Sequence, residues 1–382
     1  MMNSLKFLVL TLFTRLLQIF KVSHAILINQ ISYYPKSVKT FEAKFGGESS
    51  CSQSLMFCNA TSAMEAALFS VGVVADSNVG TTAFVIPSSY APAHSLGANI
   101  TFIDVNLESL NFDVDELEHL DVKLFALIVT HFYGNPCDME RIMSWAKKND
   151  VFVVEDCSHA HGAVCQGKPI GTWGHVGVFS LQGAKAVAAG EGAIAISNDA
   201  ELMLKMAAYG HQESFRKFNI KTENNLNLPD FGFGKKMRVH PLGAVLALED
   251  FKMLKIKNSI FSAWTRELEA LSKKSVDFRL PSVLESSERG GFCQGIPFIL
   301  ENKDSADKLK KLLLSSKVNC FSRDYTVNIM QFSNIDSEHE VRSDLPNSYN
   351  AFSQVLFVPF DQFVLPWRWA KLKSSLKGLH ND

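Results

Sequence analysis

Residues 151–198 read VFVVEDCSHAHGAVCQGKPIGTWGHVGVFSLQGAKAVAAGEGAIAISN and decide the fold class of this chain. The stretch holds three apolar runs rich in Val, Ile, Phe and Ala. Each run is bounded by polar residues or glycine, which is typical of buried β-strands. Asp156 ends the first run and Ser180 the second, and a Gly/Ala-rich loop with Lys185 leads into the third. Because open α/β sheets build their sites at the carboxyl ends of strands, we expect these three side chains to share one site.

These three functional groups match the needs of pyridoxal 5'-phosphate (PLP). The cofactor needs a lysine amine to which it can bond covalently and a carboxylate that keeps its ring nitrogen protonated. It also needs hydroxyl and backbone N–H donors for its phosphate. Lys185, Asp156 and Ser180 supply one group of each kind. We therefore predict a PLP site here, with Lys185 as the nucleophilic amine in an almost uncharged loop.

A set of segments in order along the chain carries a family resemblance. They are SYYPKSVKTFEAKF, CNATSAMEAAL, GANITFIDVNLESLNFDVDEL, HFYGNPCDMERIMSWAKK, EDCSHAHGA, GVFSLQGAK, GEGAIAISND and MRVHPLGAVLALEDF. Together they resemble the DegT/DnrJ/StrS aminotransferases. These are PLP enzymes of the aspartate-aminotransferase fold type, fold type I, and most act on nucleotide-linked keto sugars. The resemblance covers residues 25–255 well and the remainder loosely.

The fold class implied by these patterns is α/β. We expect a mainly parallel central sheet flanked by helices, with right-handed crossovers, and a smaller C-terminal α+β domain. A chain of 382 residues is long enough for two such units. We expect an amphipathic helical segment at residues 1–24, a large PLP-binding domain at 25–250 and a small domain at 251–382.

Apolar runs and helical spacing give the expected elements. In the large domain, strands are predicted at residues 83–87, 100–105, 124–131, 151–154 and 193–197. Helices are predicted at residues 139–148, with Asp138 as N-cap, at 200–208 and at 241–257. Beyond residue 258 we expect helices at 261–273 and 304–314 and strands at 292–299 and 356–358. Residues 213–230 are polar and predict a surface excursion.

Composition excludes several classes of protein. The formal net charge is −1, with 20% charged and 47% hydrophobic residues, and there is no long basic block that would indicate a nucleic-acid partner. The seven cysteines lack CxxC spacing, so we expect reduced thiols in a cytoplasmic protein and no metal site. Neither GxGxxG nor GxxxxGK[ST] follows a strand, which removes the Rossmann dinucleotide and P-loop sites.

The N-terminus allows more than one interpretation. Residues 5–20 are largely apolar but are interrupted by Lys6 and Arg15, and a secretory signal or a membrane segment is the alternative. We favour an amphipathic helix that packs on the domain, and we expect a membrane role to be unlikely. The face predicted to pack carries apolar residues at helical spacing: Phe13, Leu16, Leu17 and Phe20.

A turn that feeds a helix at residues 57–68 predicts the seat of the cofactor phosphate. The first N–H groups of a helix are unpaired and partly positive, so they bind anions. The alternative is that Asn59 or Thr61 is only an N-cap. With the PLP signature downstream, we predict phosphate binding at Ala60, Thr61 and Ser62.

The family resemblance implies roles for further residues. Asp156 would hold the ring nitrogen through a charge-assisted hydrogen bond. His159 stands where the family carries Gln or His beside the 3-oxygen of the ring. Some relatives replace the lysine with histidine and become sugar dehydratases, so the retention of Lys185 favours transamination.

Two candidate contacts depart from the family pattern. The family carries an aromatic residue that stacks on the ring, and Tyr90 is our candidate, although it could equally be a solvent-facing turn tyrosine. The family also carries an Asn that reaches the neighbouring subunit's phosphate. Lys236 replaces it here and could meet the phosphate as a point charge or be a solvated basic residue. The resemblance implies a twofold homodimer with shared active sites.

Two functions of different class remain open from the sequence. The first is a PLP-dependent aminotransferase that moves an amino group from an amino acid, glutamate by resemblance, to a keto sugar. The sugar is expected to be nucleotide-linked, in amino-sugar biosynthesis. The second is a PLP-family paralogue with a regulatory or structural role and weak or no activity. The two departures at Tyr90 and Lys236 keep the second interpretation open.

Overall fold

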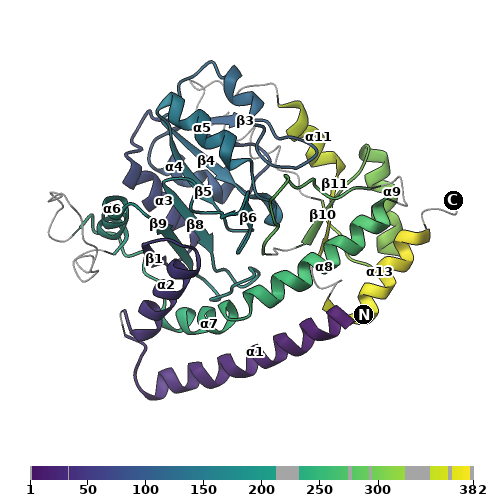
Figure 1. Ribbon diagram of the computed structural model, residues 1–382, viewed down its shortest axis with the longest axis horizontal. Coiled ribbons are helices and arrows are strands. Elements are labelled where there is room, and N and C mark those ends of the chain that lie inside the picture. Colours follow the sequence, from purple (N-terminus) through teal and green to yellow (C-terminus); the bar gives the residue numbers. More distant parts are fainter. Residues whose placement is uncertain are drawn as a thin grey trace.

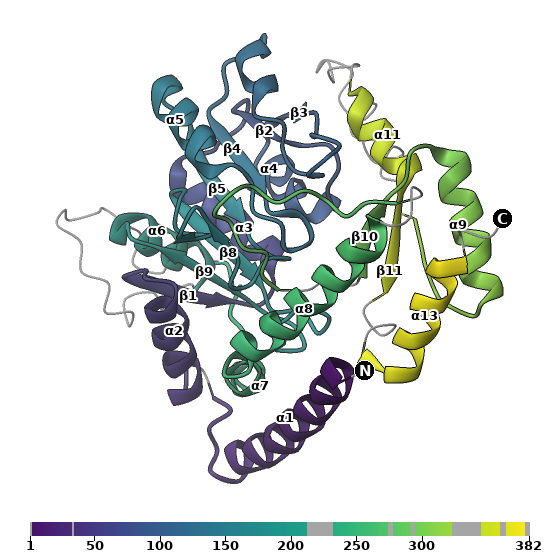
Figure 2. The ribbon, with the colours of Figure 1, turned by 45° about the vertical axis from the view of Figure 1, so that its right-hand side comes forward.

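The computed structural model describes residues 2–32, 34–211, 232–273, 278–291, 295–322, 345–359 and 364–378. A large α/β unit holds the central sheet, and a smaller unit of helices around a strand pair lies beside it (Figures 1 and 2). A long helix, α1 (Met2–Leu27), runs along one side of both units, and the N-terminus lies beside the last helix of the chain. The fold is thus the predicted α/β class.

The central sheet has seven strands among the described residues, in the order β1-β9-β8-β5-β4-β2-β3. Their bounds are β1 Gln53–Phe57, β2 Asn78–Thr82, β3 Asn99–Ile103, β4 Ala126–Thr130, β5 Phe152–Asp156, β8 Val176–Ser180 and β9 Ala193–Ser197. Only β9 is antiparallel to its neighbours, so the sheet is mainly parallel as predicted. β4, β5 and β8 lie side by side and parallel, so their carboxyl ends meet at one edge.

Helices cover both faces of the sheet. One core joins it to α3 (Ala60–Val71), α4 (Ala91–Ser95) and α6 (Ala200–Gly210). The other joins it to α2 (Lys36–Glu48), α5 (Met139–Asn149) and α7 (Pro241–Phe251). Side chains of β4 alternate between the two cores, with Ile128 in the first and Leu127 and Val129 in the second. Both faces of each strand are therefore buried, which explains the continuous apolar runs in the sequence.

The smaller unit has a core of its own. β10 (Gly295–Ile299) and β11 (Val355–Pro359) pair antiparallel. They pack with α8 (Leu254–Ser272), α9 (Lys303–Ser315), α11 (Pro346–Gln354) and α13 (Pro366–Gly378). Leu254 at the start of α8 belongs to the core of the large unit, whereas Ile260 and Trp264 belong to that of the smaller one. α8 therefore links the two units.

Several predicted helices and strands are confirmed, and the prediction of one strand is wrong. β9 has the predicted bounds, and Asp138 caps α5 by accepting a hydrogen bond from the Arg141 N–H at 3.2 Å. The strand expected at residues 83–87 lies instead at Asn78–Thr82. Asn78 and Gly80 disfavour a strand in this NVGTT sequence, but a Cβ at Gly80 would lie 2.6 Å from the Leu124 side chain, so glycine allows close packing there.

Other predictions of elements need smaller adjustments. The helix expected at residues 241–257 is two helices, because α7 ends at Phe251 and α8 starts at Leu254. The excursion at residues 213–230 and the first part of the strand at 292–299 lie outside the described residues.

The packing face predicted for α1 is wrong. Phe13, Leu16 and Phe20 are 53%, 67% and 64% exposed, and Leu17 is only half-buried. The buried residues are mainly small or polar: Ser4, Phe7, Thr14, Gln18 and Ala25. Gln18 Nε2 donates to the Leu246 carbonyl of α7 at 2.9 Å, so a backbone acceptor on the domain selects the polar face of α1. Within the described residues, no helix combines the length and apolar character needed to span a bilayer.

Candidate active site

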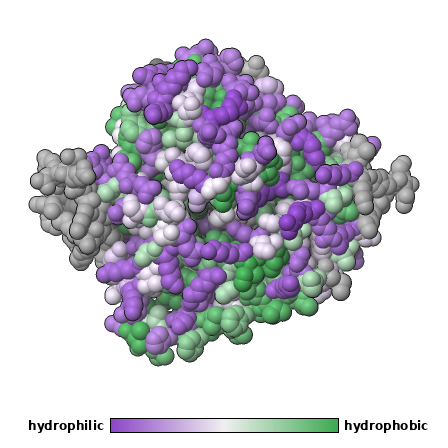
Figure 3. Space-filling view, viewed as in Figure 1, coloured by the Kyte–Doolittle hydropathy of each residue, from purple (hydrophilic) through white to green (hydrophobic). Residues whose placement is uncertain are grey.

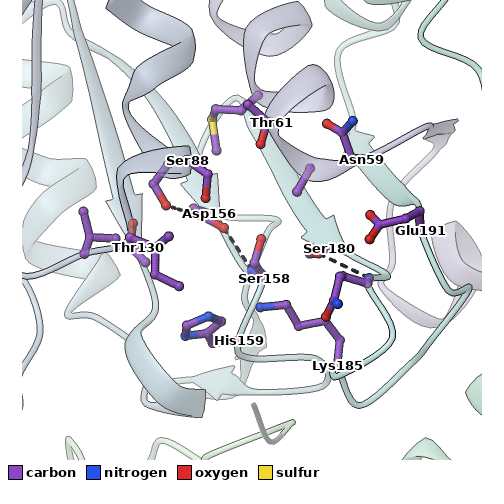
Figure 4. A pocket seen from close by; sticks show the side chains of 16 residues that line it. Asn59, Thr61, Ser88, Thr130, Asp156, Ser158, His159, Ser180, Lys185 and Glu191 are labelled. Carbon is purple, nitrogen blue, oxygen red and sulfur yellow. Dashed lines mark hydrogen bonds between the residues drawn. The ribbon is translucent and has the colours of Figure 1, made fainter. Parts of the chain in front are cut away.

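A cavity of about 220 Å³ opens at the carboxyl ends of β4, β5 and β8. Thr130, Asp156 and Ser180 are the last residues of these three strands, and all three line it (Figure 4). The full lining is Asn59, Ala60, Thr61, Met64, Val85, Ile86, Ser88, Ser89, Thr130, Asp156, Ser158, His159, Ser180, Gln182, Lys185 and Glu191. Parallel strand ends and a helix N-terminus thus converge on one small polar cavity.

Asp156 presents a buried carboxylate to this cavity. Thr130 and Asp156 are register partners at the ends of β4 and β5. Asp156 Oδ1 accepts a hydrogen bond from the Ser158 N–H at 3.0 Å, and Oδ2 accepts one from the Ser89 hydroxyl. The two serines therefore fix the plane of the carboxylate, so the group is oriented before any ligand arrives.

The N-terminus of α3 forms a second wall. Asn59 is its N-cap, and the Asn59 side chain accepts a hydrogen bond from the Ser62 N–H at 2.8 Å. Ala60 and Thr61 line the cavity. The cap uses one of the first N–H groups, and those of Ala60 and Thr61 remain as anion donors at the positive end of the helix. An N-cap at Asn59 and a phosphate seat beside it are thus compatible, so the two interpretations of this turn do not compete.

Lys185 stands in a tight loop between β8 and β9. The Lys185 N–H donates to the Gln182 carbonyl at 2.8 Å, and the Gly183 N–H donates to the Gly190 carbonyl at 2.8 Å. Gly190 has a φ of +86°, a conformation that favours glycine. From this loop the Lys185 side chain points into the cavity toward Ser158 and Asp156 (Figure 4). Lys185 and Asp156 therefore face the same cavity.

The buried ion pair of Asp250 and Lys257 forms hydrogen bonds with the backbone of this loop. Lys257 Nζ lies 2.9 Å from Asp250 Oδ1, and the side chains are 7% and 5% exposed. Lys257 Nζ also donates to the Ala186 carbonyl at 2.9 Å, and Asp250 Oδ2 accepts from the Ala188 N–H at 3.0 Å. The break between α7 and α8 lies between Asp250 and Lys257, so it belongs to the structure that supports the Lys185 loop.

His161 lies near the site as a neutral imidazole. Burial, and then the charge of Lys185, lower the pKa of His161 to about 3. Its ring also packs against Phe179, with the ring centroids 5.5 Å apart. At neutral pH the imidazole therefore adds no second cation beside Lys185.

Glu155, next to Asp156, has a structural role. It accepts hydrogen bonds from the N–H groups of Gly171, Trp173 and Gly174 at 2.6, 2.8 and 2.6 Å. His131 Nε2 lies 3.0 Å from it, and the Cys137 N–H donates to His131 Nδ1, so Nε2 carries the proton. Glu155, His131 and Cys157 lie close enough to hold a metal ion. Four donors already occupy the carboxylate and both ring nitrogens of His131 are used, so we assign this cluster to the fold.

The cavity fits PLP by its donor set. It offers an amine, an oriented carboxylate, a helix N-terminus and the Ser180 hydroxyl, which are the groups the cofactor needs. Thr130 Oγ1 is buried in its wall and has no hydrogen-bond partner among the described residues. A buried hydroxyl without a partner is rare in a folded protein and is consistent with a polar ligand at this place.

The structure brings most of the predicted site residues together. Lys185, Asp156, His159, Ser180, Ala60 and Thr61 all line the cavity, and Ser62 lies in the first turn of α3. Tyr90 does not line it. Tyr90 is 1% exposed and its ring packs against Phe102, so it is not a solvent-facing turn residue. Lys236 is exposed and does not line the cavity within this chain.

Sequence reasoning missed several residues of the cavity wall. Thr130 could have been found, because it ends a predicted strand beside Asp156. Ser89 lies in a turn that was predicted only as a connection. Val85 and Ile86 line the cavity from the run at residues 83–87, which we predicted as a strand. Their apolar character resembled a strand, which hid their position in the wall.

Several curated proteins with similar sequences are named as enzymes that act on sugars. The chain is 32% identical over 166 residues to GDP-perosamine synthase of Escherichia coli O157:H7, covering 43% of this chain and 46% of that protein. It is 30% identical over 177 residues to GDP-4-keto-6-deoxy-D-mannose 3-dehydratase of Yersinia pseudotuberculosis, covering 44% and 45%. The chain thus spans about half the length of the curated relatives it matches.

A solved structure and a family model extend the similarity over the chain. The aminotransferase from Psychrobacter cryohalolentis superposes with a TM-score of 0.85 at 21% identity, covering 95% of this chain and 96% of that one. At this identity the likeness shows the fold. The model of the DegT/DnrJ/EryC1/StrS aminotransferase family matches residues 18–364. The chain therefore belongs to the DegT/DnrJ/EryC1/StrS aminotransferase family.

Proposed function

We propose that this protein is a PLP-dependent aminotransferase that transfers an amino group from an amino acid to a keto sugar. The observation that carries the proposal is that Lys185 and Asp156 line one cavity together with the N-terminus of α3. That arrangement matches the opposite edges and the phosphate of a single PLP molecule. Family membership supports the same class of reaction.

The residues that would hold the cofactor follow from their chemistry. The Lys185 amine would bond to it, and the Asp156 carboxylate would pair with the protonated ring nitrogen. The N–H groups of Ala60 and Thr61, with the Ser180 hydroxyl, would hold the phosphate. His159 would lie beside the 3-oxygen of the ring. When bound, PLP supplies an electron sink that stabilises negative charge on the carbon next to the amine.

Lys185 has a second role after the amino donor arrives. Its amine would accept the proton from the α-carbon of the donor amino acid and return it during the transfer. The loop fixed by Asp250 and Lys257 keeps this amine in the cavity. The same base then serves the second half of the reaction, in which the keto sugar receives the amino group.

The substrates are proposed from the relatives. A nucleotide-linked keto sugar is the favoured acceptor, because the similar proteins include a GDP-perosamine synthase and a dehydratase of a GDP-linked keto sugar. Glutamate is the favoured donor by family resemblance. We further propose a twofold homodimer with shared sites, in which Lys236 reaches the partner, and a cytoplasmic location consistent with the free thiols of the described cysteines.

One titration tests the proposal. The protein is mixed with PLP, and the absorption band of the lysine-bound cofactor is followed before and after borohydride reduction. We expect the wild type and the control Lys308→Ala, an exposed lysine on α9, to form a band that reduction abolishes. Lys185→Ala should form none. The pyridoxamine form, mixed with a panel of keto sugars, should return the band with its acceptor. A wild type that takes up no PLP would support the regulatory paralogue instead.

A further inference from the structure

The exposed face of α1 is more apolar than its buried face. Between Met2 and Phe20 this helix carries eight large hydrophobic residues that are at least half exposed: Met2, Leu5, Val9, Leu12, Phe13, Leu16, Ile19 and Phe20. The face toward the domain carries Phe7 and Ala25 together with the polar Ser4, Thr14 and Gln18. In Figure 3, hydrophobic residues gather along the lower edge of the molecule, where α1 runs in Figure 1. A contiguous apolar face of this size indicates a binding surface.

Helical geometry makes this face continuous. With 3.6 residues per turn, the eight side chains fall within one arc of roughly 120°. From Met2 to Phe20 the arc extends over about 27 Å of helix. Lys6 and Arg15 are exposed and fall at opposite edges of the arc. An apolar face bordered by cations is the pattern of helices that lie in the interface of a membrane.

The Lys, Arg, Asp and Glu residues of the N-terminal segment have one sign of charge. Residues 1–41 contain Lys6, Arg15, Lys21, Lys36 and Lys39 and no acidic residue, since the first one is Glu42. A second copy of the chain would present the same cations in a twofold contact, because such a contact pairs a surface with itself. Like charges would then face each other across the apolar surface. An anionic lipid surface instead complements both the apolar arc and the cations that border it.

We propose that α1 binds flat on an anionic lipid surface, with its apolar arc below the headgroups and its cations among them. The helix then packs on the protein through its buried face, which includes Phe7 and Gln18, and on lipid through the opposite face. α1 contacts α7, α8 and α13, whereas the cavity is formed by β4, β5, β8 and α3. Membrane attachment would therefore leave the cavity accessible. This inference stands independently of the proposed reaction.

Flotation of the full chain with lipid vesicles tests the inference. The vesicles are phosphatidylcholine alone or with roughly 30% phosphatidylglycerol, a content that gives the surface a negative potential. We expect the wild type to float with the anionic vesicles and to be released by about 1 M salt, which screens charges beyond about 3 Å.

Two variants separate the apolar from the charged contribution. The first is Leu12→Gln, Phe13→Gln, Leu16→Gln and Phe20→Gln combined, which keeps the charge and should lower partitioning by about tenfold or more. The second is Lys6→Gln, Arg15→Gln and Lys21→Gln combined, which should remove the preference for anionic vesicles. The control is Val74→Gln, Val122→Gln and Leu314→Gln combined, which changes exposed apolar residues outside α1 and should float as the wild type does.

Each outcome decides for or against the proposal. Thermal melting of every variant should stay near the wild type, because the substituted side chains are exposed in this structure. A wild type that stays in solution with both kinds of vesicle would overturn the proposal. Equal binding to neutral and anionic vesicles would overturn its charge component. A four-glutamine variant that shifts from dimer to monomer in gel filtration, without vesicle binding by the wild type, would identify a second copy as the occupant.

Discussion

Glu155 and Asp156 are neighbours at the end of β5, but their carboxylates lie on opposite faces of the sheet and accept different numbers of hydrogen bonds. Glu155 shares its face with Val153 and accepts four hydrogen bonds from groups that carry protons. Asp156 shares its face with Val154 and accepts two, from Ser89 and Ser158, and it faces the cavity. One carboxylate is saturated by the fold, and the other keeps acceptor capacity for a ligand.

The difference shows how one of two adjacent residues can stabilise the fold while the other is available for function. Successive side chains of a strand point to opposite faces, so a pair of acids at a strand end reaches two environments. A buried carboxylate needs several donors to remain charged. Where the fold supplies them all, the group orders the loop at residues 171–174. Where the fold supplies only some, the group is available to a cationic ligand.

The largest expected effect is on the stability of the fold, and it follows from substitution of Glu155. Glu155→Gln should lower the free energy of unfolding by about 3–5 kcal/mol. The substitution replaces one acceptor oxygen by an amide NH₂ group, which would then face the N–H donors of the surrounding fold. Urea unfolding monitored by circular dichroism gives this value. The variant, where folded, should still bind PLP. A stable Glu155→Gln protein that binds no PLP would place Glu155 in the site and end the distinction.

Asp156→Asn tests the other side. The amide cannot hold a protonated ring nitrogen, so we expect transamination to slow roughly 10²- to 10³-fold, as for other lost electrostatic contacts at reacting groups. The free energy of unfolding should fall by only about 1 kcal/mol, because an amide oxygen still accepts one of the two hydrogen bonds. The rate is measured with the loaded enzyme and the melt without PLP. A large loss of stability with little loss of rate would contradict the assignment.

A third buried carboxylate, that of Glu42, has few hydrogen-bond donors around it. It accepts hydrogen bonds from the Tyr34 hydroxyl at 2.7 Å and the Met56 N–H at 2.9 Å. Burial raises the pKa of Glu42 to about 7, against 4.5 ordinarily. Because the folded state holds this proton more tightly, the group lowers stability as pH rises from about 4.5 to 7.

Glu42→Gln should remove that loss. At pH 8 the variant should be more stable than the wild type by roughly 2–3 kcal/mol, and the two should converge below pH 4.5. Urea unfolding across this pH range measures the difference. An unchanged pH profile would show that Glu42 stays ionised in the folded state.

The site was predictable from the sequence where the sheet determines position. Asp156 and Ser180 end buried apolar runs, and parallel strands bring such ends together, so their meeting follows from the pattern alone. Thr130 follows the same rule and could have been predicted with them. Tyr90 was chosen as the one aromatic residue of an irregular segment, where no periodicity fixes the direction of a side chain. Its ring lies in the core against Phe102 instead.

α1 shows a different limit. Its apolar spacing predicts a helix with an apolar face, and the helix is present. Spacing does not say which face the domain contacts. Gln18 bonds to the Leu246 carbonyl, a contact between residues 228 positions apart that no local pattern contains. The same limit applies to the support of Lys185 by Asp250 and Lys257, since both lie on helices far from it in sequence.

The smallest effect concerns one hydroxyl beside Asp156. Ser89 donates to Oδ2, so it either orients the carboxylate toward the ring nitrogen or competes with that nitrogen for the same oxygen. If it orients, Ser89→Ala should weaken PLP binding about fivefold, in line with about 1 kcal/mol for one hydrogen bond. Ser89→Thr keeps the hydroxyl and should bind as the wild type does, and Ser95→Ala, on the exposed side of α4, is the control. Absorbance titration gives the dissociation constants. Tighter binding of PLP by Ser89→Ala would show that Ser89 and the ring nitrogen compete for Asp156 Oδ2. In that case Oδ2 could accept from the ring nitrogen only after the Ser89 hydroxyl had rotated away from it.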